Sequence, residues 1–417
     1  MEDLKYFCSH LFTSLSFDQK GEVRVCCNNY ETPKDKDGNP ISVTDKDFSM
    51  KKAFNSDVHT RIRKNILNNK KDSGCERCWQ TEDNGADSYR TIWNNTLANG
   101  FYKDVMVESV DTVGYINDPY VTFLDFTMGN KCNLICRMCN IDNANLWENE
   151  SKLLYGNDFN APTKNVSVDD RFLSDDFFKD NFMHLRQVNF LGGEPLIIKE
   201  HTDFLKQCIK HGIAKNMILF YTTNLTVLKD ELFDLWSQFG HIYLGVSIDG
   251  YGEVDNYIRY PSKWEKLEKN IKKVSEWKKE LNMDLQIHAT FQALNILNYD
   301  KLLEWVFSLG ELGFWRLPFS NWVTYPNWYD CRILSDDLKD LATKRINKFI
   351  DSKKDVKWED GEQQWLGILK SNLVTLKEEL DDSKAVLKFK VYTKKLDRNR
   401  KQHIANHIPE LEKFIYG

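Results

Sequence analysis

Three closely spaced cysteines are the residues of this sequence with the clearest chemical potential. Cys132, Cys136 and Cys139 occur in the segment Cys-Asn-Leu-Ile-Cys-Arg-Met-Cys, with three and then two residues between them. Thiolates are the usual ligands of iron–sulfur clusters, and a cubane cluster contains four irons. Three cysteines therefore leave one iron without a protein ligand. An iron with such an open position can bind a small molecule directly.

A zinc site is the alternative for the same three residues. Structural zinc sites use four ligands in tetrahedral geometry, commonly arranged as two pairs along the chain. Between Cys139 and His201, the only cysteine or histidine is His184. The spacing therefore favours a cluster, and zinc or thiols without metal stay open as alternatives.

A second group of cysteines lies near the N-terminus and comprises Cys8, Cys26, Cys27, Cys75 and Cys78. Cys75 and Cys78 form a Cys-x2-Cys pair. Four cysteines satisfy either a zinc ion or an iron–sulfur cluster. In a reducing compartment, clustered cysteines bind metal or do chemistry more often than they form disulfides.

The elements that must position these cysteines alternate between short apolar runs and amphipathic patterns. In 263–281, apolar residues recur at steps of three and four, as in a helix with one buried face. Strands that alternate with helices form parallel sheets. Six units are too few for a closed eight-stranded barrel, so we expect an α/β fold with a partial (β/α)6 barrel. Its strands are expected at 120–126, 187–191, 217–221, 242–247, 285–291 and 315–319.

We expect four parts in the chain: a small N-terminal cysteine-rich domain at 1–84, a connector at 85–118, the partial barrel at 119–325 and a helical C-terminal extension at 326–417. The first part should contain two short strands, 11–17 and 22–26. In the last part, the basic run 384–400 is expected to be a solvated helix face. Pro409 should mark the start of a last short helix.

Composition limits the function classes. The 417 residues carry a formal net charge of −5, which argues against a nucleic-acid binder that works through overall charge. The start, MEDLKYFCSH, has no signal-peptide pattern. No apolar stretch approaches the roughly 20 residues of a membrane-spanning helix. A soluble cytoplasmic protein without a membrane partner is the expectation.

The cysteine triplet, placed at the end of the first expected barrel strand, resembles the signature of the radical S-adenosylmethionine (SAM) superfamily. Met138 precedes the third cysteine, at a position where that family often has an aromatic residue near the adenine. Gly192-Gly193-Glu194-Pro195 resembles the GGEP element, which holds the methionine amino group of SAM in that family. Glycines let backbone carbonyls approach a ligand, and Glu194 offers an acceptor to an ammonium.

Later segments resemble the same family in the same order. Each lies where an expected strand ends, which is the edge at which parallel α/β sheets bind ligands. The resemblance implies SAM contacts, to ribose, adenine or the methionine carboxylate, from Thr223, Asn224, Ser247, Asp249, Arg259 and Gln292.

The resemblance also implies a reaction. In that family a 4Fe–4S cluster, here on Cys132, Cys136 and Cys139, donates one electron to SAM. The resulting 5′-deoxyadenosyl radical abstracts hydrogen from the substrate. An external electron donor such as flavodoxin or ferredoxin is implied as a partner.

The N-terminal pattern Cys8-x12-Gly21-x4-Cys26, followed by Cys75-x2-Cys78, resembles the auxiliary-cluster modules called SPASM and twitch domains. Those modules usually follow the barrel, whereas this segment precedes it. It also has fewer cysteines than a full SPASM module, so the single-cluster twitch type fits better. The resemblance implies a second 4Fe–4S cluster on Cys8, Cys26, Cys75 and Cys78, with Cys27 as a spare.

Such enzymes often modify peptides or proteins, and this is the function that we expect. A radical enzyme for a small metabolite, such as a sugar or nucleoside, is one alternative. A nucleic-acid modifying enzyme, or a metal-bearing binding module, is the other. The catalytic residues are not evident. Cys331 follows the sixth expected strand and is a weak candidate for a hydrogen donor to a substrate radical.

Overall fold

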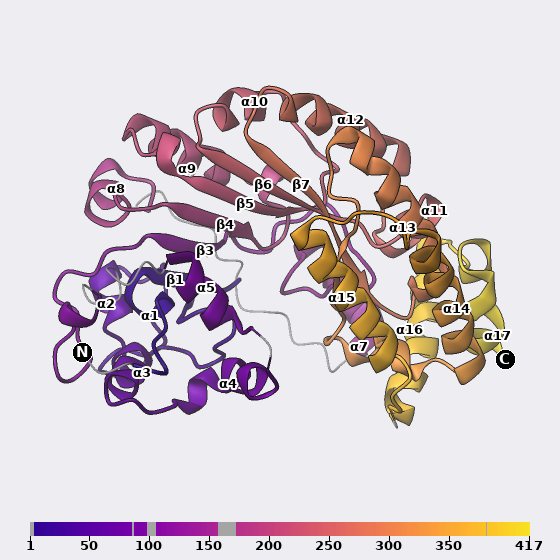
Figure 1. Ribbon diagram of the computed structural model, residues 1–417, viewed down its shortest axis with the longest axis horizontal. Coiled ribbons are helices and arrows are strands. Elements are labelled where there is room, and N and C mark those ends of the chain that lie inside the picture. The colour runs from indigo at the N-terminus through magenta and orange to yellow at the C-terminus, as the bar shows by residue number, and fades with distance from the viewer. Residues whose placement is uncertain (1–3, 86, 98–105, 157–171, 381) are drawn as a thin grey trace. The chain divides into compact units, whose positions relative to one another are not determined.

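The computed structural model describes residues 4–85, 87–97, 106–156, 172–380 and 382–417. Its eight strands follow the order β2-β1-β3-β4-β5-β6-β7-β8 in one unclosed sheet (Figure 1). This confirms the predicted α/β fold with a partial barrel. The strands are β1 (Ser14–Phe17), β2 (Val23–Arg24), β3 (Phe123–Thr127), β4 (Gln187–Leu191), β5 (Ile218–Thr223), β6 (His241–Ser247), β7 (Met283–Phe291) and β8 (Phe319–Trp322).

Packing divides the chain into two compact units. The first comprises Met1–Asn130, Lys164–Phe220 and Gln238–Gly240, and the second comprises Lys131–Thr163, Tyr221–Ser237 and His241–Gly417. The expected domain boundaries at 84, 118 and 325 were placed from the sequence pattern and not from packing, so they stay a prediction.

In the first unit, an N-terminal hairpin extends the parallel sheet. β1 pairs antiparallel with β2 and parallel with β3, with Ser14 opposite Phe123. Gly21 supplies the positive φ of 74° at the turn between β1 and β2. β3 continues in parallel to β4, with Phe123 opposite Gln187. The two expected N-terminal strands exist only in shortened form. The expectation of a strand at 11–13 is wrong, because those residues belong to a helix, His10–Thr13, and the second strand covers Val23–Arg24 alone. Both strands join the barrel sheet, which the sequence did not predict.

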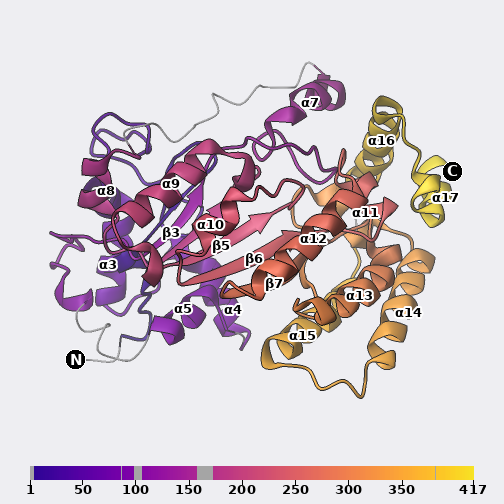
Figure 2. The same ribbon diagram turned by 90° about the horizontal axis from the view of Figure 1, so that it is seen from above.

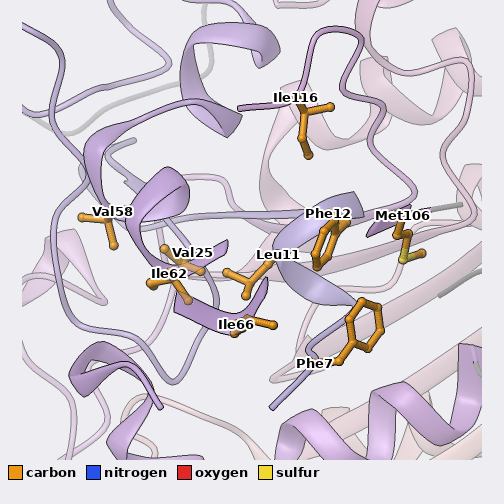
Figure 3. Packing of buried hydrophobic residues seen from close by; sticks show 9 residues of the cluster. All are labelled: Phe7, Leu11, Phe12, Val25, Val58, Ile62, Ile66, Met106 and Ile116. Atoms are coloured by element: carbon orange, nitrogen blue, oxygen red, sulfur yellow. The ribbon is translucent and has the colours of Figure 1, made fainter. Parts of the chain in front are cut away.

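The helices of the first unit cover the sheet and build an N-terminal core. A group of apolar side chains packs between α1, α3 and neighbouring loops (Figure 3), and comprises Phe7, Leu11, Phe12, Val25, Val58, Ile62, Ile66, Met106 and Ile116. Cys8 and Cys75 pack against this core. The helices are α1 (His10–Thr13), α2 (Met50–Phe54), α3 (Asp57–Leu67), α4 (Glu76–Asp83), α5 (Tyr89–Leu97), α8 (Asp175–Asn181) and α9 (Lys199–Lys210).

In the second unit, β6, β7 and β8 are parallel neighbours. Ile242 lies opposite Met283, and His288 lies opposite Phe319. The expected helix at 263–281 is α12 (Trp264–Lys278), which runs alongside β6 and β7 (Figure 2). The last expected strand, 315–319, is shifted along the chain and begins at Phe319. Pro318 has no N–H to donate to a ladder, so the chain bends before the strand starts.

The C-terminal part of the second unit is helical, as expected. A 3-10 turn at Pro409–Leu411 starts the last short helix, α17 (Glu412–Tyr416). The other helices of this unit are α7 (Glu148–Tyr155), α10 (Glu231–Trp236), α11 (Glu253–Ile258), α13 (Tyr299–Ser308), α14 (Asp336–Ser352), α15 (Asp360–Thr375) and α16 (Ser383–Arg400). Among the described residues, no helix is long and apolar enough to cross a membrane.

The expectation that 384–400 is a solvated helix face is wrong for one side of α16. The buried side chains of α16 recur at steps of three and four residues along most of its length: Ala385, Phe389, Thr393, Leu396, Asp397 and Arg400. Lysines on the other side of the helix mask this apolar stripe in the composition. α16 lies beside α7 in both views (Figures 1 and 2), and Lys395 Nζ donates to the carbonyl of Leu153 at 3.3 Å.

Candidate cluster and cofactor site

The cysteine triplet lies in a loop of the second unit that is held by hydrogen bonds at both ends. The N–H of Cys132 donates to Oδ1 of Asn145 at 3.1 Å, and that of Cys139 donates to the carbonyl of Cys136 at 3.0 Å. The indole N–H of Trp147 also donates to the carbonyl of Cys136, at 3.1 Å. The loop is therefore wrapped tightly, as three converging ligands require.

The structure brings the three predicted cysteines close together. The thiols of Cys136 and Cys139 hydrogen-bond to each other, and the charge of Cys132 acts on Cys139. Because it accepts the bond from Cys139, and because Arg259 is near, Cys136 has a lowered pKa despite its burial. The donated bond and burial raise the pKa of Cys139. The positive charge of Arg259 thus favours the thiolate of Cys136, and thiolates are the form that binds iron.

Arg259 joins the triplet to a buried pair of carboxylates. Its Nη1 lies 4.0 Å from Sγ of Cys136, and its Nε lies 2.7 Å from Oδ2 of Asp249. Burial raises the pKa of Asp249, and it raises that of Asp255 to about 7. Asp255 accepts a hydrogen bond from the N–H of Asp249 at 2.9 Å. The sequence reasoning missed Asp255, although it lies four residues before Arg259, a helical spacing that places the two on one face.

Asn224 approaches the triplet from the end of β5. Its Nδ2 lies 4.0 Å from Sγ of Cys132 and donates to Oδ1 of Asn133 at 3.1 Å. Its Oδ1 accepts from the N–H of Thr226 at 2.9 Å. Thr223, also predicted, is buried, and its Oγ1 accepts from the N–H of Leu225 at 3.0 Å. The polar stretch after β5 therefore lies beside the cysteine loop.

Gln292 follows β7 and is fully buried. Neither atom of its side-chain amide has a hydrogen-bond partner among the described residues. Its neighbour Asn295 donates to the carbonyl of Asp249 at 2.9 Å, which ties this turn to the Asp249–Arg259 pair. An orphaned buried amide is costly unless a ligand or water satisfies it. Gln292 therefore fits a polar cofactor such as SAM.

Ser247 and Met138 are the two remaining predicted residues of this unit. Ser247 ends β6 opposite His288 and is half-buried. Met138 is half-buried within the cysteine loop. Their contacts with a cofactor stay predictions.

The Gly192-Gly193-Glu194 segment belongs to the first unit. Gly192 has a φ of +95°, and a Cβ there would lie 2.5 Å from the carbonyl oxygen of Gly129. The N–H of Gly193 donates to the same carbonyl at 3.1 Å. Only glycine fits this approach between two strand ends. Glu194 is buried, and its Oε1 accepts from the N–H of Leu196 at 3.1 Å.

The four N-terminal cysteines predicted as ligands line one cavity of the first unit. Cys8, Cys26, Cys75 and Cys78 border it together with His10, Tyr89 and Arg90. Burial and the neighbouring thiols raise the pKa of Cys8 and Cys26 to about 12. Four cysteines that lie far apart in the sequence thus surround a single cavity.

Cys27 behaves differently from these four. It does not line the cavity. Its thiol is instead hydrogen-bonded to Tyr89, and the residue is exposed. The expected role of Cys27 as a spare stays a prediction.

In the part of the chain that the structure covers, no group of three or more His, Cys, Asp or Glu side chains is arranged to hold a single metal ion. Cys331 is fully buried in a 3-10 turn, Cys331–Ile333, and burial raises its pKa well above the usual value. Its role as a hydrogen donor stays a prediction.

Residues 126–285 match the Radical SAM superfamily. The chain carries a radical SAM domain. The matched segment contains the cysteine triplet, the Gly192–Glu194 element and Arg259, so the radical SAM domain includes most of the residues that resemblance had assigned. The match confirms the predicted radical SAM domain over this segment, and it leaves the reaction unspecified.

Solved structures similar to this chain include one described as native anSMEcpe with bound AdoMet, with a TM-score of 0.40 and 17% identity, covering 56% of this chain and 61% of that one. Streptococcus suis SuiB bound to S-adenosylmethionine has a TM-score of 0.36 and 13% identity, covering 71% and 60%. SuiB bound to the precursor peptide SuiA has a TM-score of 0.35 and 13% identity, covering 74% and 66%. The chain thus spans about three fifths of the first two proteins. The sequence matches none of the curated proteins.

Proposed function

We propose that this protein uses Cys132, Cys136 and Cys139 to hold a 4Fe–4S cluster that cleaves SAM, and that it modifies a peptide or protein. When bound, a reduced cluster of this kind supplies the electron that converts SAM into methionine and a hydrogen-abstracting 5′-deoxyadenosyl radical. The observation that carries the proposal is the convergence of the three cysteines in one loop, with Arg259 beside Cys136.

The surrounding residues of the second unit prepare the site. The positive charge of Arg259 favours the thiolate of Cys136, which is the iron-binding form. The paired Asp249 neutralises Arg259 inside the protein, so that the buried site does not hold an isolated charge. The amide of Gln292 offers a donor and an acceptor to a polar ligand. Glu194, in the first unit, is proposed as the acceptor for the ammonium of SAM.

A second 4Fe–4S cluster on Cys8, Cys26, Cys75 and Cys78 is part of the proposal. It is supported by their position around one cavity, where bound metal would offset the burial that now keeps the thiols protonated. A zinc ion with the same four ligands is the competing assignment.

The peptide or protein substrate is the finer part of the proposal. One of the similar structures is described as bound to a precursor peptide, and that description belongs to SuiB alone. For this chain, the support is the twitch-like cysteine pattern, whose members cluster in space. A small-metabolite substrate is the alternative. An external flavodoxin or ferredoxin as electron donor, and a reducing cytoplasm as the location, complete the proposal.

Metal analysis tests the two clusters together. The protein is purified without oxygen, reconstituted, and analysed for iron, sulfide and zinc beside a variant with Cys132, Cys136 and Cys139 changed to alanine. We expect about eight irons in the intact chain and about four in the variant. Equal iron in both would contradict the cluster on the triplet. Zinc in place of the last four irons would contradict the auxiliary cluster.

A further inference from the structure

Two charged residues, one in the cysteine loop and one on the following helix α7, each form a buried ion pair with helix α16. Arg137 lies between Cys136 and Cys139, and its Nη2 contacts Oδ1 of Asp397 at 2.6 Å, with the two side chains 0% and 3% exposed. Glu150 lies on α7 and contacts Nη2 of Arg400 at 2.5 Å, with both side chains similarly buried. Asp397 and Arg400 are three residues apart, so one face of α16 serves both pairs.

The Arg137–Asp397 pair is embedded in further hydrogen bonds. Nε of Arg137 donates to the carbonyl of Tyr257 at 3.0 Å, and its guanidinium lies 3.7 Å from the centre of the Tyr257 ring. The Tyr257 hydroxyl donates to Oδ1 of Asp397 at 2.8 Å. The other oxygen of Asp397 accepts from the N–H of Ile404 at 3.0 Å. Tyr257 and Asp397 therefore hold the Arg137 side chain from two sides, and Asp397 is itself held by Tyr257 and Ile404.

Arg400 reaches the cysteine loop itself. Its Nη2 donates to the carbonyl of Ile135, between Cys132 and Cys136, at 2.7 Å. Its guanidinium also lies 5.6 Å from the ring centre of Trp147, which donates to the carbonyl of Cys136. Two backbone carbonyls of the loop are thus held by Arg400 or by the indole that it covers.

Buried ion pairs are a poor means of gaining stability, because apolar side chains of similar volume often serve as well or better. The two pairs instead fix the position of α16 along its axis, because only one alignment of the helix satisfies both of them. We call this alignment the register of α16. Because both pairs hold the segment that carries the three cysteines, this register determines the shape of the ligand loop.

We propose that α16 is a part of the cluster site, and that Asp397 and Arg400 are positioning residues for Cys132, Cys136 and Cys139. This inference rests on the proposed function. The C-terminal extension then fixes the loop into which the cluster is inserted. Residues that orient metal ligands from outside typically change metal affinity or activity about 10- to 100-fold when removed.

The test compares Asp397→Asn and Arg400→Gln with a matched control, Glu410→Gln. Glu410 pairs with Arg345 at 2.7 Å in the same C-terminal part, and not with the cysteine loop. Each variant is reconstituted in the full chain, and we measure iron per chain, the midpoint potential of the cluster, 5′-deoxyadenosine formation and far-UV circular dichroism.

We expect Asp397→Asn and Arg400→Gln to keep their helical signal and to lose SAM cleavage about 10- to 100-fold, with less iron or a shifted potential. Combining Asp397→Asn with the triple cysteine-to-alanine change should remove no more iron than the triple change alone. Glu410→Gln should behave as the wild type. If both positioning variants match the wild type in iron, potential and cleavage, the inference is wrong. It is also wrong if Glu410→Gln loses as much as they do, because the effect is then general destabilisation.

A second variant keeps the test decisive if Asp397→Asn does not fold. Arg137→Met combined with Asp397→Leu removes both charges and leaves none unpaired. A folded double variant with a shifted potential and weak cleavage supports positioning by the ion pair, and one with wild-type cleavage overturns it. Failure of the proposed function looks different: the triple cysteine variant would then keep all of the iron of the wild type.

Discussion

Nη1 of Arg259 lies 4.0 Å from the sulfur of Cys136, while Nε of the same guanidinium lies 2.7 Å from Oδ2 of Asp249. One cation therefore lies beside both a predicted cluster ligand and a buried carboxylate. The sequence resemblance implied that Arg259 pairs with the carboxylate of SAM. Its position beside the triplet adds a role in the protonation and packing of the site.

Replacing Arg259 should destabilise the fold as well as the site. In Arg259→Gln, the Asp249 carboxylate stays buried without its partner, which typically costs about 3–5 kcal/mol. We expect the urea midpoint of unfolding to fall accordingly. Arg259→Lys keeps the charge and serves as the control, and it should recover part of the loss. An unchanged midpoint in Arg259→Gln would show that Asp249 is not charged in the folded protein.

Asp255 should make stability depend on pH. Its pKa is raised to about 7 by burial, so the folded state holds a proton that the unfolded state has released. This contribution is fully present below the unfolded pKa near 4 and is lost as the pH rises through 7, by up to roughly 4 kcal/mol. In Asp255→Asn, the free energy of unfolding should fall less between pH 5 and pH 8 than in the wild type, two values that bracket most of the window. Parallel pH profiles of the two proteins would contradict this assignment.

Gly192→Ala should destabilise the fold more than Gly212→Ala, because both glycines have a positive φ but only Gly192 is crowded. Gly192 (φ +95°) would place a Cβ 2.5 Å from the carbonyl of Gly129, whereas Gly212 (φ +73°) has open space around it. Backbone strain of about 1 kcal/mol is common to both changes. Chemical denaturation should therefore show the larger loss for Gly192→Ala than for Gly212→Ala. Equal losses would mean that the two strand ends separate freely.

Gln292→Leu should separate stability from cofactor binding. The buried amide has no partner among the described residues, so an apolar replacement removes a desolvation penalty of about 1–3 kcal/mol. We expect the apoprotein to unfold at the same or a higher denaturant concentration, while SAM binding weakens and the iron content stays unchanged. Undiminished SAM affinity, measured by calorimetry without oxygen, would exclude Gln292 from the cofactor site.

The N-terminal cysteines should divide into ligands and a spare. Cys75→Ala removes a residue that lines the shared cavity, whereas Cys27→Ala removes a thiol outside it that is hydrogen-bonded to Tyr89. Iron and sulfide analysis should show the loss of about four irons for Cys75→Ala and none for Cys27→Ala. The reverse pattern would reassign the ligands.

Local sequence patterns predicted what local physics determines. A short apolar run predicted β4 at Gln187–Leu191, and the period of three and four residues predicted α12. The strand pairing of Ser14 with Phe123 was not predictable, because no local pattern specifies partners so far apart. The shift of the last strand to Phe319 follows from Pro318, a signal that was present in the sequence but not used.

In the candidate site, too, local sequence patterns predicted some residues and not others. The types and spacing of the three cysteines predicted a metal-binding loop, and the structure brings these cysteines together. The partners Arg137–Asp397 and Glu150–Arg400 had no such signal, because a basic helix reads as solvated unless its buried stripe is noticed. Tertiary packing alone shows that Asp397 and Arg400 lie against the loop.

Reductive cleavage of SAM is the central reaction of the proposed function. The reconstituted protein is incubated without oxygen with SAM and dithionite, and 5′-deoxyadenosine and methionine are quantified by mass spectrometry beside a Cys136→Ala variant. We expect both products from the wild type and neither above background from the variant. Equal product from the two proteins, or none from a wild type that retains its iron, would contradict the assignment of Cys132, Cys136 and Cys139 as the ligands of a SAM-cleaving cluster.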